Sequence, residues 1–150
     1  MIISAGLFLI KKDHTLLVCH PTKTKKTVWS IPKGKVEDGE HYISAAIRET
    51  YEESNVNVSN WSIMHNLTPV KYPNGKKVLY GYALFETQNK INFDNFEFKC
   101  NSNVPEDKGG YPEMDDFKWV TIDEARSLLH VSQVECLNEI EKIIEKIKKK

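Results

Sequence analysis

The chain has 150 residues, with 21 basic and 21 acidic side chains and therefore no formal net charge. This length predicts one domain, spanning residues 1–150, with enough residues for a hydrophobic core. The balanced charge gives no general attraction to nucleic acid or to membranes. No apolar run reaches about 18 residues, and the N-terminal stretch lacks a basic region followed by a small-residue cleavage site. We therefore expect a cytoplasmic protein that does not bind a membrane.

The cysteines indicate the same compartment. Cys19, Cys100 and Cys136 are odd in number, lie far apart and form no C-x-x-C pair. This pattern fits reduced thiols better than a disulfide framework, and packing is the role we expect for them.

Two apolar runs open the chain, at residues 4–10 (SAGLFLI) and 16–20 (LLVCH), on either side of the polar sequence KKDHT. They predict a hairpin of two buried strands. Residues 21–27 are polar and rich in lysine, which predicts a loop. Its lysines either contact a polyphosphate or are simply solvated: Lys23, Lys25 and Lys26.

The run W-S-I-P-K-G, residues 29–34, leads from this loop into an acidic stretch. Trp29 either stacks on a nucleobase or fills space beneath the predicted sheet. Lys33 and Lys35 flank the acidic stretch and could neutralise the charge of a phosphate.

A helix is predicted to begin near Glu40. At 100° per residue, Glu52 lies about 60° to one side of Glu49 and Glu53 about 40° to the other, so the three carboxylates share a face. The alternative is a solvated acidic face. Oxygen ligands of this kind suit a hard cation, Mg²⁺ or Mn²⁺. The same helical geometry puts an apolar stripe suited to a sheet on the opposite face: Ile43, Ile47, Thr50 and Tyr51.

Two further strands are predicted after the helix. Residues 56–67 alternate weakly, and residues 76–85 (KKVLYGYALF) form the clearest β segment. One face of this strand would carry Val78, Tyr80, Tyr82 and Leu84, and the other Leu79, Gly81, Ala83 and Phe85. Three tyrosines near the second strand could stack on a nucleobase, although packing is the alternative for each: Tyr72, Tyr80 and Tyr82.

Residues 89–112 hold several aromatic side chains without a clear period. Such a stretch predicts a lid or substrate loop, with an edge strand at residues 95–99 as the alternative. Glu113, Asp115 and Asp116 follow it. Two helices are then predicted, at residues 123–129 with Thr121 as the cap, and from about residue 132 to the end.

The order G-x5-E-x7-R-E-T-x-E-E-x-N-V from Gly34 to Val56 resembles the signature of the Nudix hydrolases, G-x5-E-x7-R-E-U-x-E-E-x-G-U. One position departs from it, because Asn55 stands where the family has glycine. That glycine ends the helix with positive φ, which asparagine also tolerates. A later W-V-x-x-x-E-A segment, residues 119–125, resembles the late part of many Nudix domains, so that the resemblance covers nearly the whole chain.

The resemblance implies an α/β fold, the Nudix α/β/α sandwich with a mixed sheet between helices. It also implies roles for the residues of the signature. Glu49 and Glu53 would bind the metal directly with Glu52 completing the set, and the carbonyl group of Gly34 would face it. Glu40 and Arg48 would support the site. Glu113 matches a loop glutamate that serves relatives as base or extra metal ligand, with Asp115 and Asp116 as competitors for that role.

The activity implied is hydrolysis of a nucleoside diphosphate linked to another moiety. The runs W-S-I-P-K-G-K-V-E and K-K-V-L-Y, and the late E-x-x-x-F-x-W, look most like diadenosine polyphosphate hydrolases. Small phage-encoded Nudix enzymes that also accept ADP-ribose and FAD look similar. The first expectation is therefore a dinucleoside polyphosphate or an ADP-ribose- or FAD-like adenylate. Two alternatives stay open: pyrophosphate or NAD-cap removal from RNA 5′ ends, and a nucleotide sensor without catalysis. The sequence leaves monomer and homodimer equally open.

Overall fold

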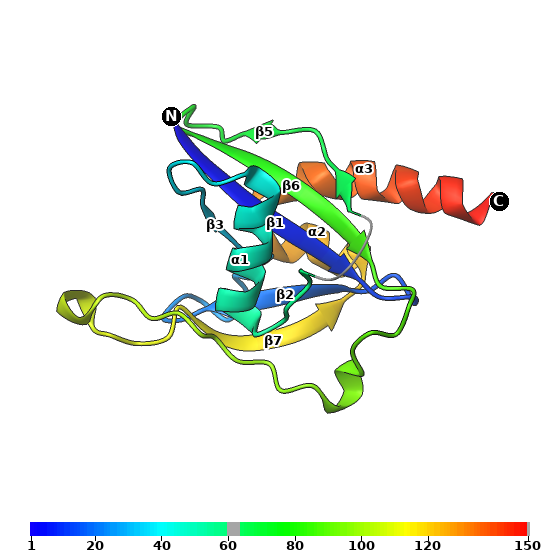
Figure 1. The fold of residues 1–150 in the computed structure, drawn as a ribbon. Helices are drawn as coiled ribbons and strands as arrows, with labels where there is room; N and C mark the ends of the chain where they lie inside the picture. The colour runs from blue at the N-terminus through cyan, green and yellow to red at the C-terminus, as the bar shows by residue number, and fades with distance from the viewer. Residues whose placement is uncertain (60–63, 150) are drawn as a thin grey trace.

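A computed structural model describes residues 1–59 and 64–149 of the chain. Within these ranges the chain forms one mixed β-sheet with helices on both faces, shown in Figure 1. The strands are β1 (Ile2–Ile10), β2 (Leu16–Pro21), β3 (Lys33–Lys35), β4 (His65–Asn66), β5 (Val70–Lys71), β6 (Lys77–Phe85) and β7 (Met114–Val120). The helices are α1 (Tyr42–Ser54), α2 (Ile122–Leu128) and α3 (Val131–Lys148), with short 3-10 turns η1 (Phe93–Asn95) and η2 (Glu106–Lys108).

The sheet is built around β1. Its main order is β4-β6-β1-β2-β7, while β3 pairs with β1 and β5 with β6. β1 runs parallel to β6 along its whole length and antiparallel to β2 and β3. The predicted hairpin of the first two strands is therefore confirmed, and so is the predicted α/β fold with a mixed sheet between helices.

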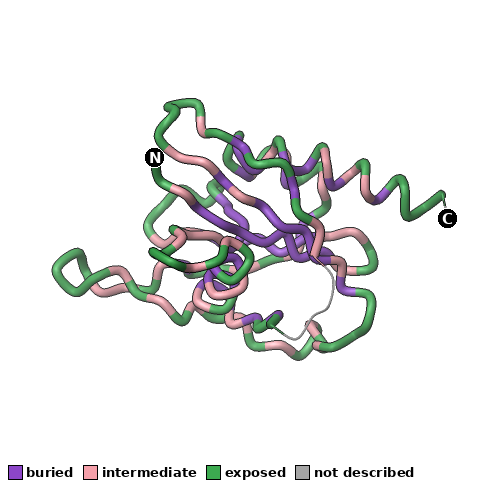
Figure 2. Tube along the Cα trace, turned by 45° about the horizontal axis from the view of Figure 1, so that its top comes forward, coloured by how far each residue is buried: buried purple, intermediate pink, exposed green. Residues whose placement is uncertain are grey.

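Apolar side chains on both faces of β1 explain why helices cover both sides. Phe8 and Ile10 belong to the core beneath α2 and α3, whereas Leu7 and Leu9 belong to the core beneath α1. The buried residues therefore form a central band along the strands (Figure 2). β6 shows the predicted alternation, with Leu79 and Ala83 in the first core and Tyr82 and Leu84 in the second.

The prediction for the buried face of α1 was right for Thr50, which is buried, and for Ile47, which packs partly buried against the core, and wrong for Ile43 and Tyr51. Ile43 and Tyr51 are 38% and 46% exposed, and the helix instead buries Ala45 and Ala46 against the sheet. Two alanines let the helix backbone approach the strands closely. This orientation turns Glu49 and Glu53 inward as well. Thr50, which was predicted on the apolar stripe, is buried.

Two predicted strands differ from the structure. Among the described residues between 56 and 67, only His65–Asn66 forms a strand, and Val56 and Val58 are buried without strand geometry. Residues 60–63 lie outside the described residues. No strand forms at residues 95–99, which the structure does describe. Phe98 packs instead on Phe117 and Trp119, and Phe96 packs on Phe93 and Phe98.

The last two helices agree with the sequence. Thr121 caps α2 by accepting from the N–H of Glu124, whose carboxylate accepts in return from the N–H of Thr121. α3 buries Leu137, Ile140 and Ile144. None of the helices in the described part of the chain is both long and apolar enough to cross a membrane.

Candidate active site

The carboxylates of α1 meet β3 at one end of the sheet. β3 pairs with β1 from Ser4 to Gly6, which places Gly34 directly against the side chain of Glu49. A Cβ atom on Gly34 would lie 2.1 Å from Cδ of Glu49. Only glycine fits here, so the signature glycine is required by the contact between strand and helix.

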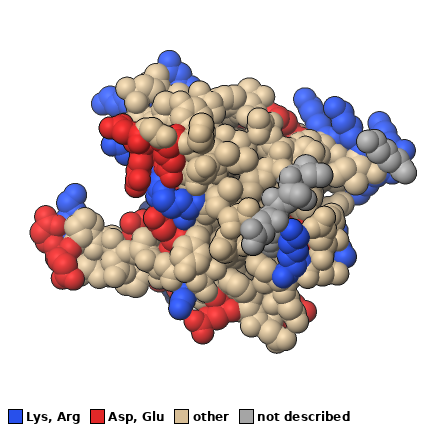
Figure 3. All heavy atoms as spheres, viewed as in Figure 1, with Lys and Arg blue, Asp and Glu red and all other residues tan. Residues whose placement is uncertain are grey.

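Arg48 holds the cluster together. Its Nε donates to Glu40 Oε2 at 2.8 Å, its Nη1 donates to Glu49 Oε1 at 2.9 Å, and the same Nη1 lies 3.2 Å from Glu52 Oε2. Its Nη2 donates to the carbonyl oxygen of Lys35 at 3.0 Å. The hydrogen bond with Arg48 lowers the pKa of Glu40. Acidic and basic side chains lie next to one another along a notch at the left of Figure 3, where α1 and β3 lie in Figure 1.

The two inward carboxylates are strongly affected by burial. Glu53 is only 4% exposed, and Oε1 accepts from the N–H of Lys33 at 3.0 Å. Burial raises the pKa of Glu53 to about 8 and that of Glu49 to about 7, although Lys33 and Arg48 act in the opposite direction. Buried carboxyl groups with raised pKa values are characteristic of functional sites, because burying a charge is costly unless a counter-charge accompanies it.

The donor set fits a hard divalent cation, since it consists of carboxylate oxygens and backbone carbonyl groups. In the described residues, however, no three His, Cys, Asp or Glu side chains are arranged as a group that could hold a metal ion. The oxygens of Glu49, Glu52 and Glu53 are held by Arg48 and by the N–H of Lys33. These bonds engage Oε1 of Glu49 and Oε1 of Glu53, so a cation could bind through Oε2 of each carboxylate with Arg48 still in place.

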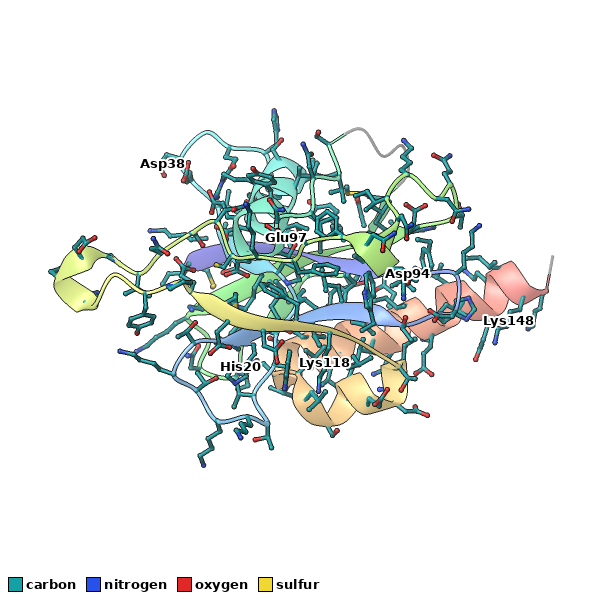
Figure 4. The ribbon with its side chains drawn as sticks, turned by 90° about the horizontal axis from the view of Figure 1, so that it is seen from below. His20, Asp38, Asp94, Glu97, Lys118 and Lys148 are labelled. Carbon is teal, nitrogen blue, oxygen red and sulfur yellow. The ribbon has the colours of Figure 1, made fainter. Side chains whose placement is uncertain are left out.

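The three acids after the long loop have different surroundings. The charge of Glu113 contributes to the raised pKa values of both Glu49 and Glu53, so it lies within electrostatic range of the cluster. Asp115 instead pairs with Nδ1 of His20 at 2.6 Å. Asp116 is exposed and accepts from the N–H of Phe117. In Figure 4, His20 lies on the side of the sheet that carries α2 and α3.

Three of the predicted substrate-binding residues line one pocket of about 420 Å³: Trp29, Lys33 and Tyr72. The sequence reading missed His130, which stacks on Tyr72 with ring centroids 4.9 Å apart and lines the same pocket. The sequence gives little signal for His130, because it precedes α3 and is far from Tyr72 along the chain. Trp29 is 7% exposed and donates from Nε1 to the carbonyl oxygen of Lys26, so its ring is mostly buried.

The other predicted substrate-binding residues lie elsewhere. Tyr80 packs against Tyr42 of α1 with ring centroids 4.4 Å apart, and Tyr82 is buried on the same face. That face is opposite to the one that holds Tyr72. Lys35 is exposed, and its backbone, not its side chain, contacts Arg48.

A second pocket, of about 710 Å³, shares Trp29 with the first and is lined by His20, Lys23, Thr24, Lys26, Trp29, Asp115 and Asp116. Two of the three loop lysines considered in the sequence, Lys23 and Lys26, therefore border a hollow near Glu113. The N–H of Thr22 donates to the carbonyl oxygen of Glu113 at 2.9 Å, which holds this loop beside the site.

Comparisons with known proteins identify a family and a shared fold. The family described as "NUDIX domain" matches residues 2–139. An RNA pyrophosphohydrolase of Pelagibacter ubique is 26% identical over 125 residues, which are 83% of this chain and 78% of that protein. A C. elegans Ap4A hydrolase, solved as a binary complex, has the same fold with a TM-score of 0.66 and 19% identity, over 95% of this chain and 98% of that one. A bifunctional NMN adenylyltransferase/ADP ribose pyrophosphatase from Francisella tularensis gives 0.65 and 17%, over 93% of this chain and 40% of that one.

The chain therefore belongs to the Nudix family. It is a Nudix pyrophosphohydrolase, which confirms the predicted family and the predicted class of enzyme.

Proposed function

We propose that this enzyme hydrolyses a pyrophosphate bond in dinucleoside polyphosphates or in ADP-ribose- or FAD-like adenylates, with Mg²⁺, or Mn²⁺ in its place, bound at α1. The observation that carries the metal site is the pair of buried carboxylates, Glu49 and Glu53, whose pKa values burial raises to about 7 and about 8. A cation among them would remove the cost of their ionisation.

Each signature residue has a role in this proposal. Glu49 and Glu53 bind the metal directly, Glu52 completes the set, and Gly34 contributes its carbonyl oxygen. When bound, the metal offsets phosphate charge and lowers the pKa of a bound water. Arg48 and Glu40 keep the carboxylates in place before the metal arrives, through the hydrogen bonds from Arg48 to Glu40, Glu49 and Glu52.

Glu113 is the proposed general base. The effect of its charge on Glu49 and Glu53 supports this role. Asp115 is the weaker competitor, because its carboxylate is already paired with His20. Asp116 is exposed to solvent and accepts from the N–H of Phe117.

The pocket of Trp29, Lys33, Tyr72 and His130 is the proposed site for a nucleobase. The rings of Tyr72 and His130 offer flat aromatic surface, and a base stacked on an aromatic side chain gains about 1–3 kcal/mol. Lys33 joins this pocket to the carboxylates, since its N–H binds Glu53 while its side chain lines the pocket. A phosphate attached to the base would therefore reach the metal. Lys35, Tyr80 and Tyr82 remain predicted substrate contacts at other positions.

Removal of pyrophosphate or an NAD cap from RNA 5′ ends is the second candidate. The Pelagibacter ubique relative named as an RNA pyrophosphohydrolase favours it. The second pocket, with Lys23 and Lys26 at its rim, offers room for a following nucleotide. We propose that the enzyme acts in the cytoplasm on a nucleotide or RNA partner, as a monomer or homodimer.

A substrate panel tests the proposal. Purified enzyme with Mg²⁺, and then with Mn²⁺, would receive diadenosine tri- to hexaphosphates, ADP-ribose, FAD, NADH, nucleoside triphosphates and RNA with 5′-triphosphate or NAD caps. Preferential release of AMP, ADP or ATP from a dinucleotide is the expected result. Preference for RNA would establish the second candidate. Tight binding without turnover would instead indicate a nucleotide sensor.

A further inference from the structure

The residue that departs from the Nudix signature is fully engaged in the structure. Asn55 caps α1 in the left-handed conformation, with φ 72° and ψ 6°. Its Nδ2 donates to the carbonyl oxygen of Glu97 at 3.1 Å, and its Oδ1 accepts from Nδ2 of Asn101 at 2.9 Å. Glycine could adopt the same backbone conformation but could form neither bond.

Asn101 binds the end of the same helix. Its Nδ2 also donates to the carbonyl oxygen of Tyr51 at 3.1 Å, and its N–H donates to the carbonyl oxygen of Glu52 at 2.6 Å. The N–H of Lys99 lies 3.4 Å from the carbonyl oxygen of Ser54. The last carbonyl groups of a helix lack partners within the helix. Here they are bound by residues 97–102, which we call the linking segment, and they belong to the turn that carries Glu52 and Glu53.

The other end of the linking segment holds Glu113. The N–H of Glu113 donates to the carbonyl oxygen of Ser102 at 3.1 Å. The N–H of Met114 lies 3.4 Å from Sγ of Cys100, which in turn donates to the carbonyl oxygen of Ser102 at 3.1 Å. Figure 1 shows the segment passing beneath the end of α1 and along the start of β7. Figure 4 places Glu97 on the α1 side of the sheet.

We propose that Asn55 and Asn101 are positioning residues that set the place of Glu113 relative to the carboxylates of α1. The linking segment is the one stretch bound both to the last turn of α1 and to the backbone of Glu113, as far as the hydrogen bonds of the described residues show. The role of the segment in catalysis rests on the proposed function, in which Glu53 binds the metal and Glu113 is the base. A base displaced by about 1 Å loses on the order of 100-fold in rate.

Two variants and one matched control test this role. Asn101→Ala removes the side-chain bonds to Tyr51 and Asn55. Asn55→Gly restores the signature residue, keeps the backbone conformation and removes both side-chain bonds. Asn92→Ala is the control, because Asn92 caps η1 in the same long loop by accepting from the N–H of Asp94 at 3.1 Å and is absent from the bonds to α1.

Both test variants should lower kcat by on the order of 10-fold to 100-fold, with KM changed by less than about 2-fold. Their melting temperatures should lie close to that of Asn92→Ala, whose kcat should match the wild type. Hydrogen exchange of the metal-free proteins should become faster at the last turn of α1 and at Glu113 in Asn101→Ala, but not in Asn92→Ala.

Two results would overturn the inference: a kcat in Asn101→Ala no lower than in Asn92→Ala, or exchange at Glu113 that Asn101→Ala leaves unchanged. A wild-type enzyme without turnover on any substrate would refute the proposed function instead. The exchange measurement uses no substrate, so it still decides whether Asn101 links α1 to Glu113.

Discussion

A single arginine serves several carboxylates at the end of the sheet. Arg48 donates to Glu40, Glu49 and Glu52, and this raises its own pKa well above the usual range. One guanidinium cannot neutralise all these acids, and Glu53 lies deeper, with only a backbone N–H as donor. At the scale of the residue, the site is therefore short of positive charge, which a divalent cation would supply.

The role of Glu113 can be tested at this scale. Glu113→Gln keeps the size of the side chain but removes its ability to take a proton, so kcat should fall on the order of 100-fold with little change in KM. Steady-state kinetics of Glu113→Gln and of Asp116→Asn would measure this. An equal fall in Asp116→Asn would move the role of base to Asp116.

The contribution of His20 to the stability of the protein should depend on pH. Burial, the largest single influence, lowers the pKa of His20. The hydrogen bonds of His20 to Asp115 and to the carbonyl oxygen of Lys25 act in the opposite direction, and the net shift of the pKa is upward. A raised pKa means that this contribution to stability is fully present below about pH 6.5, the unfolded value, and is lost as pH rises through the folded pKa.

We therefore expect the contribution of His20 to the free energy of unfolding to fall from about pH 6.5 upward. Glu49 and Glu53, whose pKa values are also raised, change stability in the same direction. The contribution of His20 is isolated by comparing wild type with Asp115→Asn in urea titrations across this range. Identical slopes in the two proteins would refute it.

At the scale of the element, α1 packs on the sheet through its smallest side chains. Ala45 and Ala46 are fully buried, while Ile43 remains exposed. The close approach that the alanines permit brings Glu49 against Gly34 and Glu53 against Lys33. The packing of the helix and the geometry of the carboxylates therefore have the same cause.

A pair of substitutions tests this packing. Ala46→Leu forces a large side chain between helix and sheet and should destabilise the protein by about 1–3 kcal/mol. Ile43→Ala removes an exposed side chain and should change stability by less than about 0.5 kcal/mol. Urea unfolding measures both. A larger loss in Ile43→Ala would mean that the buried face has been assigned wrongly.

The sequence predicted some of these elements and missed others for physical reasons. β6 was readable because its apolar and aromatic residues favour a strand, and its burial on both faces explains why they form a nearly continuous run. The buried face of α1 could be predicted only in part, because hydrophobicity ranks isoleucine above alanine whereas close packing of a helix on a sheet favours alanine. The alternative prediction of a strand at residues 95–99 was wrong. Aromatic residues favour strands, but here they form a cluster with Phe117 and Trp119.

At the scale of the whole molecule, one end of the sheet collects what the reaction needs. The fixed spacing from Gly34 to Val56 allowed the carboxylates to be predicted, because those residues are close along the chain. Tyr72 and His130 are far apart along the chain and meet only in the folded protein, so Tyr72 could be predicted as a candidate and His130 could not. The two pockets that share Trp29 likewise depend on contacts between segments that are distant along the chain.

Glu53→Gln, compared with wild type and with Glu145→Gln at the exposed end of α3, tests whether α1 binds the catalytic metal. Mn²⁺ titration and turnover of the best substrate would be measured on all three proteins. We predict that Glu53→Gln lowers both Mn²⁺ affinity and kcat by on the order of 100-fold, while Glu145→Gln matches wild type. Unchanged turnover and unchanged Mn²⁺ affinity in Glu53→Gln would contradict a metal site on α1.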